Sequence, residues 1–133
     1  MITNKYLDEV FKELKIEGEE YFYYFYVYNL PKTEVYMMNG ILPIGDIEHI
    51  IVCFTNKRLM FLEVTMMGKL TGNTTIIDLD TLDKIKVKRG MIRTSIIVTP
   101  KETQKDMTIK ANSFTFGLSN QKKNLKELAK LYS

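Results

Sequence analysis

A regular alternation of apolar and polar residues between residues 82 and 111 constrains the fold of this chain more than any other feature. Ile85 and Val87 alternate with lysines, and residues 92–98 continue the same period of two. A third run, residues 106–111, repeats the pattern. Because successive side chains of a strand point to opposite faces of its sheet, the alternation predicts antiparallel strands with one face in a core and the other in water.

Gly90 separates the first two of these runs and predicts a tight hairpin turn between them. The turn fits at Arg89-Gly90 or at Gly90-Met91, and we prefer the second position, with glycine first. The two positions differ by two residues in register, so both keep the apolar faces together.

Four further runs rich in aromatic and β-branched residues predict additional strands. They comprise residues 20–28, 49–54, 58–64 and 74–80. Residues 29–46 contain two prolines and two glycines and predict a long connection, and residues 66–73 predict a flexible linker.

Apolar residues at spacings of three and four predict one amphipathic helix near each end of the chain. The first covers residues 3–15, with Thr3 or Asn4 as its cap, and the second follows Ser119. The apolar face of the second helix comprises Leu125, Leu128, Ala129 and Tyr132. The sequence therefore predicts a mainly β fold of the α+β class, in which about seven antiparallel strands curve toward a barrel and the C-terminal helix covers its open end.

The composition indicates a single soluble globular domain. The chain has 133 residues, of which 45% are hydrophobic and 26% are charged. It holds no run of the roughly 20 apolar residues that a membrane-spanning helix needs. The charged N-terminal segment does not resemble a secretory signal, and Cys53 is the only cysteine, so we expect a cytoplasmic protein, with peripheral membrane association as an alternative.

Charge is distributed unevenly along the chain. Residues 1–50 hold 4 Lys and Arg against 9 Asp and Glu, whereas residues 83–110 hold 8 against 3. Such asymmetry can mark an anion-binding face, a head-to-tail contact between copies, or charge complementarity within one molecule.

The segment TNKRLMF, residues 55–61, is the most distinctive short stretch of the chain. It joins two predicted strands, so Asn56 and Lys57 are expected to form the turn of a hairpin, where asparagine tolerates positive φ and the lysine lies in water. Arg58 begins the next strand and is expected to pair with a nearby carboxylate.

This segment, together with the order of the predicted elements, resembles the bacterial pleckstrin-homology-like (PH-like) domain family. The likeness covers roughly residues 19–132. It implies a seven-stranded barrel capped by a C-terminal helix, without catalytic activity. Under this resemblance residues 1–133 form one PH-like domain, in which residues 1–18 are an N-terminal helical extension and residues 19–133 are the barrel with its helix.

No arrangement of residues in the sequence supports catalysis, a metal site or a cofactor. His49 and Cys53 are four residues apart, which in a strand separates them by roughly 13 Å. Asp78 and Asp80 share a strand face near its end, where two carboxylates alone are typical of solvated side chains. We therefore expect a protein that is not an enzyme.

A row of cations on the predicted outer sheet face is the best candidate for a binding site. It comprises Lys84, Lys86, Lys88, Arg93 and Lys110. The row can be an ordinary solvated face, or it can meet anionic lipid head groups or an acidic partner. Nonspecific binding to a nucleic-acid backbone is the weakest alternative, because no aromatic residues lie between these cations.

Two methionine pairs fall in predicted connections: Met37 with Met38, and Met66 with Met67. They can form an adaptable contact surface or fill gaps in the core. Taken together, the sequence predicts a non-catalytic interaction or assembly module that acts through protein contacts, with self-association as one form of them. Peripheral binding to anionic lipid through the basic sheet face is the alternative.

Overall fold

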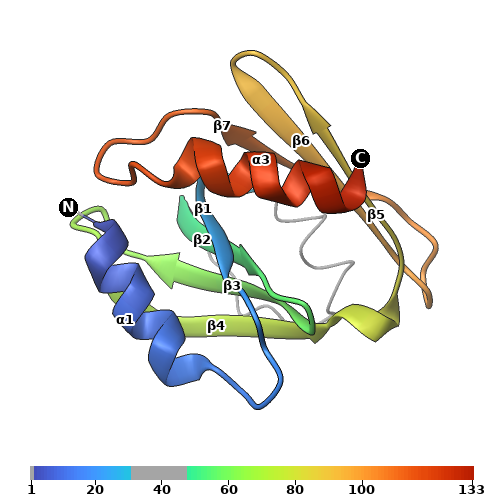
Figure 1. Ribbon diagram of the computed structural model, residues 1–133, viewed down its shortest axis with the longest axis horizontal. Coiled ribbons are helices and arrows are strands. Elements are labelled where there is room, and N and C mark those ends of the chain that lie inside the picture. The colour runs from blue at the N-terminus through green and yellow to red at the C-terminus, as the bar shows by residue number, and fades with distance from the viewer. Residues whose placement is uncertain (1, 31–47) are drawn as a thin grey trace.

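The computed structural model describes residues 2–30 and 48–133 and contains seven antiparallel strands and two α-helices in these ranges (Figure 1). In chain order the elements are α1 (Asn4–Leu14), β1 (Tyr23–Tyr28), β2 (His49–Phe54), β3 (Arg58–Val64), β4 (Leu70–Asp78), the 3₁₀ turn η1 (Leu79–Thr81), β5 (Leu82–Arg89), β6 (Arg93–Pro100), β7 (Met107–Asn112) and α3 (Gln121–Tyr132). The predicted fold, with a C-terminal helix and an extra N-terminal helix, is confirmed.

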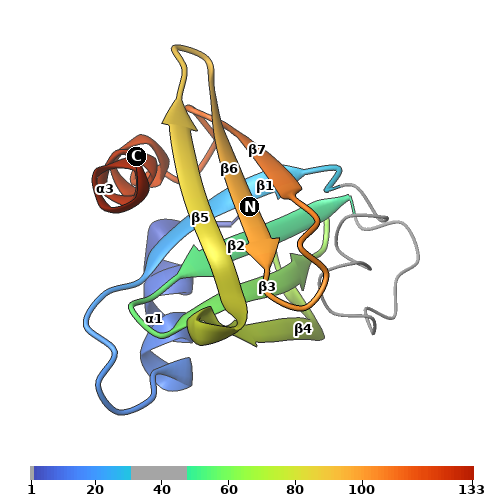
Figure 2. The same cartoon turned by 90° about the vertical axis from the view of Figure 1, so that its right-hand side faces the viewer.

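The strands form two sheets, with the orders β1-β2-β3-β4 and β5-β6-β7. Figure 2 shows that the strands of the smaller sheet cross those of the larger one. α3 contacts both β1 and β5. The space between the sheets is filled by the inward side chains of all seven strands and by Leu125 and Leu128 of α3, which form one hydrophobic core. The predicted apolar face of the last helix is therefore confirmed.

The other face of the larger sheet is covered by α1 (Figure 1). Leu7 and Phe11 are buried against strand residues that include Cys53 and Met60. This second layer explains why residues 49–54 read as a continuous apolar run rather than an alternating one, since both faces of β2 are buried. Thr3 caps the helix, and its side chain accepts a hydrogen bond from the Tyr6 N–H at 3.2 Å.

Several predicted boundaries agree with the structure and others do not. β2 and β3 have the predicted bounds, whereas β1 begins at Tyr23 rather than at residue 20. β4 begins at Leu70, so the predicted linker over residues 66–73 is shorter than expected. The Thr65 N–H donates to the Lys69 carbonyl at 2.8 Å and closes the β3–β4 hairpin early, with Gly68 at φ 84°. The predicted connection at residues 29–46 lies almost wholly outside the described residues.

The predicted position of the β5–β6 turn is wrong at both of its alternatives. Arg89 pairs with Thr94, and the Gly90 N–H donates to the Arg93 carbonyl at 2.8 Å, so Met91 and Ile92 form the turn. A Cβ atom on Gly90 would lie 2.6 Å from that carbonyl oxygen. Glycine is therefore required here for the close approach of two strands and not for the turn itself.

The start of α3 also differs from the prediction by one residue. The N-cap residue is Asn120, although its side chain makes no capping hydrogen bond. Ser119 instead accepts a hydrogen bond from the Asn4 side-chain amide at 2.6 Å. This contact links the beginning of α3 to the beginning of α1.

Candidate functional site

The predicted row of cations lies on one face of the β5-β6-β7 sheet. Lys88 pairs with Ser95, which in turn pairs with Lys110, so these three residues form a line across the sheet. Buried residues alternate with exposed ones along each strand, and all five cations are on the exposed side. The structure thus brings together Lys84, Lys86, Lys88, Arg93 and Lys110, which we call the basic face.

Charge is graded along the basic face. At one end Asp83 precedes Lys84, and Asp106 accepts a hydrogen bond from Thr99 at 2.6 Å. At the other end Lys88 and Lys110 are separated only by Ser95. No ion pair joins any of the five cations to another described residue. All five side chains are exposed to solvent.

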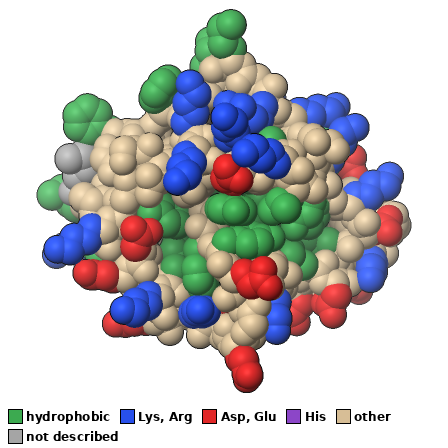
Figure 3. All heavy atoms as spheres, viewed as in Figure 1, with side chains coloured by type: hydrophobic (Ala, Val, Ile, Leu, Met, Phe, Trp, Pro, Cys, Tyr) green, Lys and Arg blue, Asp and Glu red, His purple; other side chains and the backbone are tan. Residues whose placement is uncertain are grey.

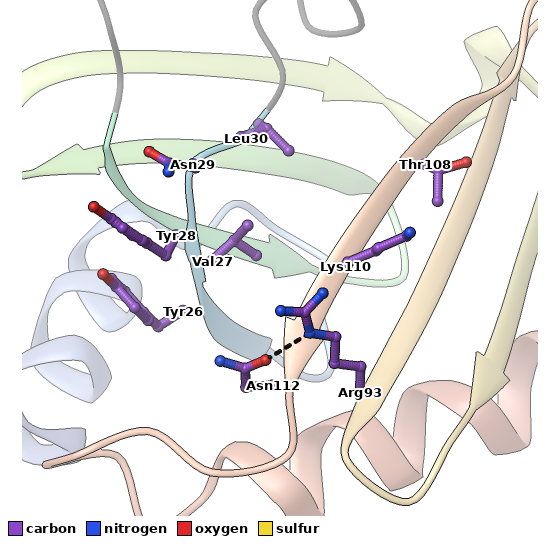
Figure 4. A pocket seen from close by; sticks show the side chains of 9 residues that line it. All are labelled: Tyr26, Val27, Tyr28, Asn29, Leu30, Arg93, Thr108, Lys110 and Asn112. Atoms are coloured by element: carbon purple, nitrogen blue, oxygen red, sulfur yellow. Dashed lines mark hydrogen bonds between the residues drawn. The ribbon is translucent and has the colours of Figure 1, made fainter.

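The cationic end of this face borders a pocket of about 660 Å³ between β7 and the end of β1 (Figure 4). Arg93 and Lys110 lie beside each other on one side of it, and Tyr26 and Tyr28 lie on the other. Arg93 Nε donates to the side-chain oxygen of Asn112 at 3.2 Å. The pocket can hold a small anionic group beside two cations.

The structure does not bring His49 and Cys53 together as a reactive pair. His49 Nδ1 lies 2.6 Å from the hydroxyl of Tyr26, whereas Cys53 is fully buried beneath α1. Burial raises the pKa of the Cys53 thiol well above its usual value, so the group is protonated at neutral pH. Asp78 and Asp80 are exposed, and in residues 2–30 and 48–133 no group of three or more His, Cys, Asp and Glu is placed to hold a metal ion.

The TNKR segment has a structural role. Arg58 and Glu19 form a buried ion pair, with Arg58 Nε 2.9 Å and Nη2 2.8 Å from the two carboxylate oxygens. The hydroxyl of Thr55 donates to Glu19 at 2.6 Å, and Arg58 Nη2 also donates to the Leu14 carbonyl at 2.8 Å. The expected pairing of Arg58 with a carboxylate is therefore found.

Asn56 and Lys57 bind the connection between α1 and β1. The Asn56 side chain accepts from the Glu20 N–H and donates to the Gly18 carbonyl, both at 2.9 Å. Lys57 is exposed, as expected, and its Nζ also donates a hydrogen bond to the Glu17 carbonyl at 3.0 Å, which the sequence did not predict. The hairpin turn at these two residues is confirmed, but Asn56 does not adopt positive φ. Residues 55–58, which we call the clasp turn, hold the α1–β1 connection.

A second surface, which the sequence indicated only in part, consists of exposed apolar side chains on three loops. They lie in the β3–β4 hairpin, the β5–β6 hairpin and the β7–α3 loop, and each is more than 70% exposed. We call this set the apolar rim: Met66, Met67, Met91, Ile92, Phe114 and Phe116.

Exposure decides between the two interpretations of Met66 and Met67, which are not gap fillers in the core. Met37 and Met38 lie outside the described residues. Sequence reasoning missed Phe114 and Phe116, although a signal was present. Both phenylalanines fall between the last predicted strand and the last predicted helix, so no periodic pattern of a buried element accounts for them.

Seven antiparallel strands in two sheets, with a C-terminal helix packed on them, have the architecture of a PH-like domain. The family model described as Bacterial PH domain matches residues 17–131, and the chain belongs to this family, whose domains are typically non-catalytic. The match begins just after α1, at the connection that the clasp turn holds. Searches of curated proteins and of solved structures each found no match. None of the helices in the described part of the chain is long and apolar enough to cross a membrane.

Proposed function

We propose that the protein is a non-catalytic interaction module that docks on an anionic membrane surface through the basic face. The observation that carries the proposal is the register of β5, β6 and β7, which aligns five exposed cations on one side of a sheet. Each cation near an anionic membrane contributes about 1 kcal/mol of attraction. Several cations on one face therefore suffice for reversible binding.

Two further features favour lipid over the other anionic partners. The outward residues between the cations are Ser95, Ile97 and Thr108, none of which can stack on a nucleic-acid base. Part of the acidic N-terminal half is also engaged within the molecule, since Glu19 pairs with Arg58. This lowers the support for a head-to-tail assembly driven by charge.

Co-sedimentation with vesicles tests the proposal. The wild type is expected to bind anionic vesicles and not neutral ones, and the variant Lys84→Glu/Lys86→Glu/Lys88→Glu is expected to bind at least about tenfold more weakly. The matched control is Lys5→Glu/Lys12→Glu/Lys15→Glu, which makes the same change in net charge at exposed positions on and just after α1. Absence of wild-type binding, or equal losses in both variants, would overturn the proposal.

A protein partner is a second candidate, favoured by a half-exposed aromatic cluster beside α3. The rings of Tyr21 and Tyr23 stack with centroids 4.4 Å apart, and Leu131 is 50% exposed. Burial, followed by interactions with Tyr132, raises the pKa of Tyr21 to about 12. Figure 3 shows hydrophobic side chains gathered on this side of the molecule, bordered by both basic and acidic residues. Tyrosine is enriched in protein interfaces.

Light scattering in low and high salt tests the self-associating form of this candidate. An oligomer that persists in high salt and is lost in Leu131→Glu supports contact through the aromatic cluster. An oligomer that dissociates as salt rises indicates assembly by charge, because exposed ion pairs are screened. A monomer under both conditions counts against self-association.

A further inference from the structure

We propose that the apolar rim inserts into the interfacial layer of an anionic membrane while the basic face lies against the head groups. The inference rests on the proposed function and adds to it a second, apolar contact and a defined orientation of the domain. It assigns a role to six side chains that the hydrophobic core does not use.

The exposure of the rim is unusual for a folded domain. Met91 is 95% exposed, Phe116 is 86% and Met66 is 82%. Single exposed apolar residues are common on protein surfaces, but large ones gathered on neighbouring loops mark a contact surface. Transfer of such side chains from water to an apolar layer is favourable in proportion to their area.

The three loops of the rim are held next to one another. Ser113, which precedes the rim residues of the β7–α3 loop, donates from its N–H to the Ile92 carbonyl at 2.8 Å and from its hydroxyl to the Met91 carbonyl at 3.3 Å. Met66 and Phe116 line the same pocket of about 430 Å³. The β7–α3 loop is therefore joined to each of the other two loops of the rim.

The shape of the rim fits a lipid layer better than a folded partner. Figures 1 and 2 show the β5–β6 hairpin projecting beyond the other strands, with Met91 and Ile92 at its tip. In Figure 3 hydrophobic side chains project at the top and along the left margin of the molecule. A fluid interface accommodates projecting side chains of any arrangement, whereas a protein partner would need a matching set of cavities.

Cations lie next to the apolar side chains of the rim, where they can contact anionic lipid head groups. Lys88 and Arg89 precede the apolar tip of the hairpin and Arg93 follows it, so the tip is apolar and its base is cationic. Lys122 Nζ lies 5.5 Å from the ring centre of Phe114. Apolar side chains flanked by lysine and arginine are typical of segments that lie in a membrane interface.

Two carboxylates lie on elements that adjoin the rim, and one of them is engaged. Glu63, two residues before the β3–β4 turn, accepts hydrogen bonds from Thr71 at 2.8 Å and from Asn73 at 2.9 Å. Glu48 lies 3.8 Å from His49, at the start of β2. The cations of the hairpin and of α3 outnumber these two groups, so the rim end attracts an anionic surface.

A single tryptophan placed in the rim reports insertion directly, because the chain contains none. The Ile92→Trp variant is expected to shift its emission to shorter wavelength with anionic vesicles and to be quenched by brominated lipid chains. The matched control is Ile16→Trp, at a partly exposed position just after α1, whose emission is expected not to change. Emission from Ile92→Trp that stays unshifted in sedimenting vesicles would overturn insertion and leave the proposed function standing.

The Met91→Ser/Ile92→Ser variant separates the apolar contact from the electrostatic one. Both side chains are exposed, so the fold should persist. In high salt, where charge is screened, the variant is expected to bind anionic vesicles at least about tenfold more weakly than the wild type. Equal binding of the variant and the wild type in high salt would overturn insertion. Failure of the wild type to sediment with anionic vesicles would overturn the proposed function. If the emission of Ile92→Trp shifts when the protein concentration is raised without vesicles, the rim contacts a second copy of this chain and insertion is overturned.

Discussion

The Glu19–Arg58 pair is an ionic contact that water hardly reaches, since the two side chains are 0% and 9% exposed. Burial alone would raise the pKa of Glu19, but hydrogen bonds from Arg58, the Ile16 N–H and Thr55, together with the charge of Arg58, lower it to about 2. The carboxylate is therefore ionised in the folded protein across the usual pH range.

Removing one charge of the Glu19–Arg58 pair should lower the free energy of unfolding far more than removing both charges. Arg58→Met leaves a buried carboxylate without its cation and is expected to lower the free energy of unfolding by about 3–5 kcal/mol. The double variant Glu19→Leu/Arg58→Met removes both charges and should recover most of this loss. Urea denaturation of the three proteins measures both effects, and a double variant less stable than Arg58→Met would contradict the argument.

The same pair gives a pH dependence. Because the pKa of Glu19 is lower in the folded protein than its ordinary value of 4.5, the group adds stability above about pH 4.5 that is lost as the pH falls toward 2. The stability advantage of the wild type over the double variant should narrow over this window. Urea midpoints measured at a series of pH values test this, and an unchanged difference would contradict it.

The clasp turn shows what the sequence could and could not predict about single residues. Local pattern placed the turn at Asn56 and Lys57 correctly, since two apolar runs meet there. It did not predict the role of their side chains, because Gly18 and Glu17 lie 38 and 40 residues earlier in the chain. Hydrogen bonds between distant loops leave no periodic trace in a sequence.

α1 is the element that seals the larger sheet. Phe11 is 1% exposed and stacks on Tyr24 with centroids 5.5 Å apart, above the buried Cys53. Phe11→Ala is expected to cost about 3–5 kcal/mol and to increase the rate at which a thiol reagent modifies Cys53. The exposed position Glu9 supplies the control, since Glu9→Ala should leave that rate unchanged. Equal rates in both variants would mean that α1 does not protect the thiol.

The β5–β6 hairpin depends on the close approach at Gly90. Gly90→Ala places a Cβ atom against the Arg93 carbonyl and is expected to lower the free energy of unfolding by about 1–3 kcal/mol. Ser95→Ala, a change on the exposed face of the same hairpin, is the comparison. Denaturation curves that coincide for the two variants would show that the strand can move aside.

The strands were predictable and their registers were not. Alternation identified β5 and β6 because one face of each is buried, but registers that differ by two residues bury the same face. The observed turn, at Met91 and Ile92, lies one residue further along the chain than the second predicted position. The close contact of Gly90 with the Arg93 carbonyl is a feature of this register that the alternation does not indicate. The early start of β4 was missed for a different reason: residues 71–73 are Thr, Gly and Asn, all exposed, so they show no alternation of buried and exposed side chains.

The whole chain should unfold as one unit. α3 contacts both sheets, and residues of both sheets share one core with Leu128. Leu128→Ala is expected to cost about 2–5 kcal/mol and to speed amide hydrogen exchange in β2 and β6 by similar factors. Exchange that rises in only one sheet would show two separately stable parts and would contradict the prediction of a single domain.

The basic face was predictable from the sequence because its residues follow the strand period, whereas the apolar rim was not. Phenylalanine and isoleucine in a sequence usually indicate a core, and only the three-dimensional structure places Ile92 and Phe114 outside it. The sequence therefore indicates the charged half of the candidate site but only Met66 and Met67 of its apolar half.

The clasp turn and the β3–β4 hairpin stand at opposite ends of β3, since residues 55–58 lead into that strand and Met66 lies two residues after its end. The residues by which the architecture is recognised are therefore separated by a full strand from those that would meet a partner. Substitutions in the rim loops can accumulate without disturbing the Glu19–Arg58 contact. The surface that we propose for binding can therefore change in sequence without weakening the contacts that hold the fold together.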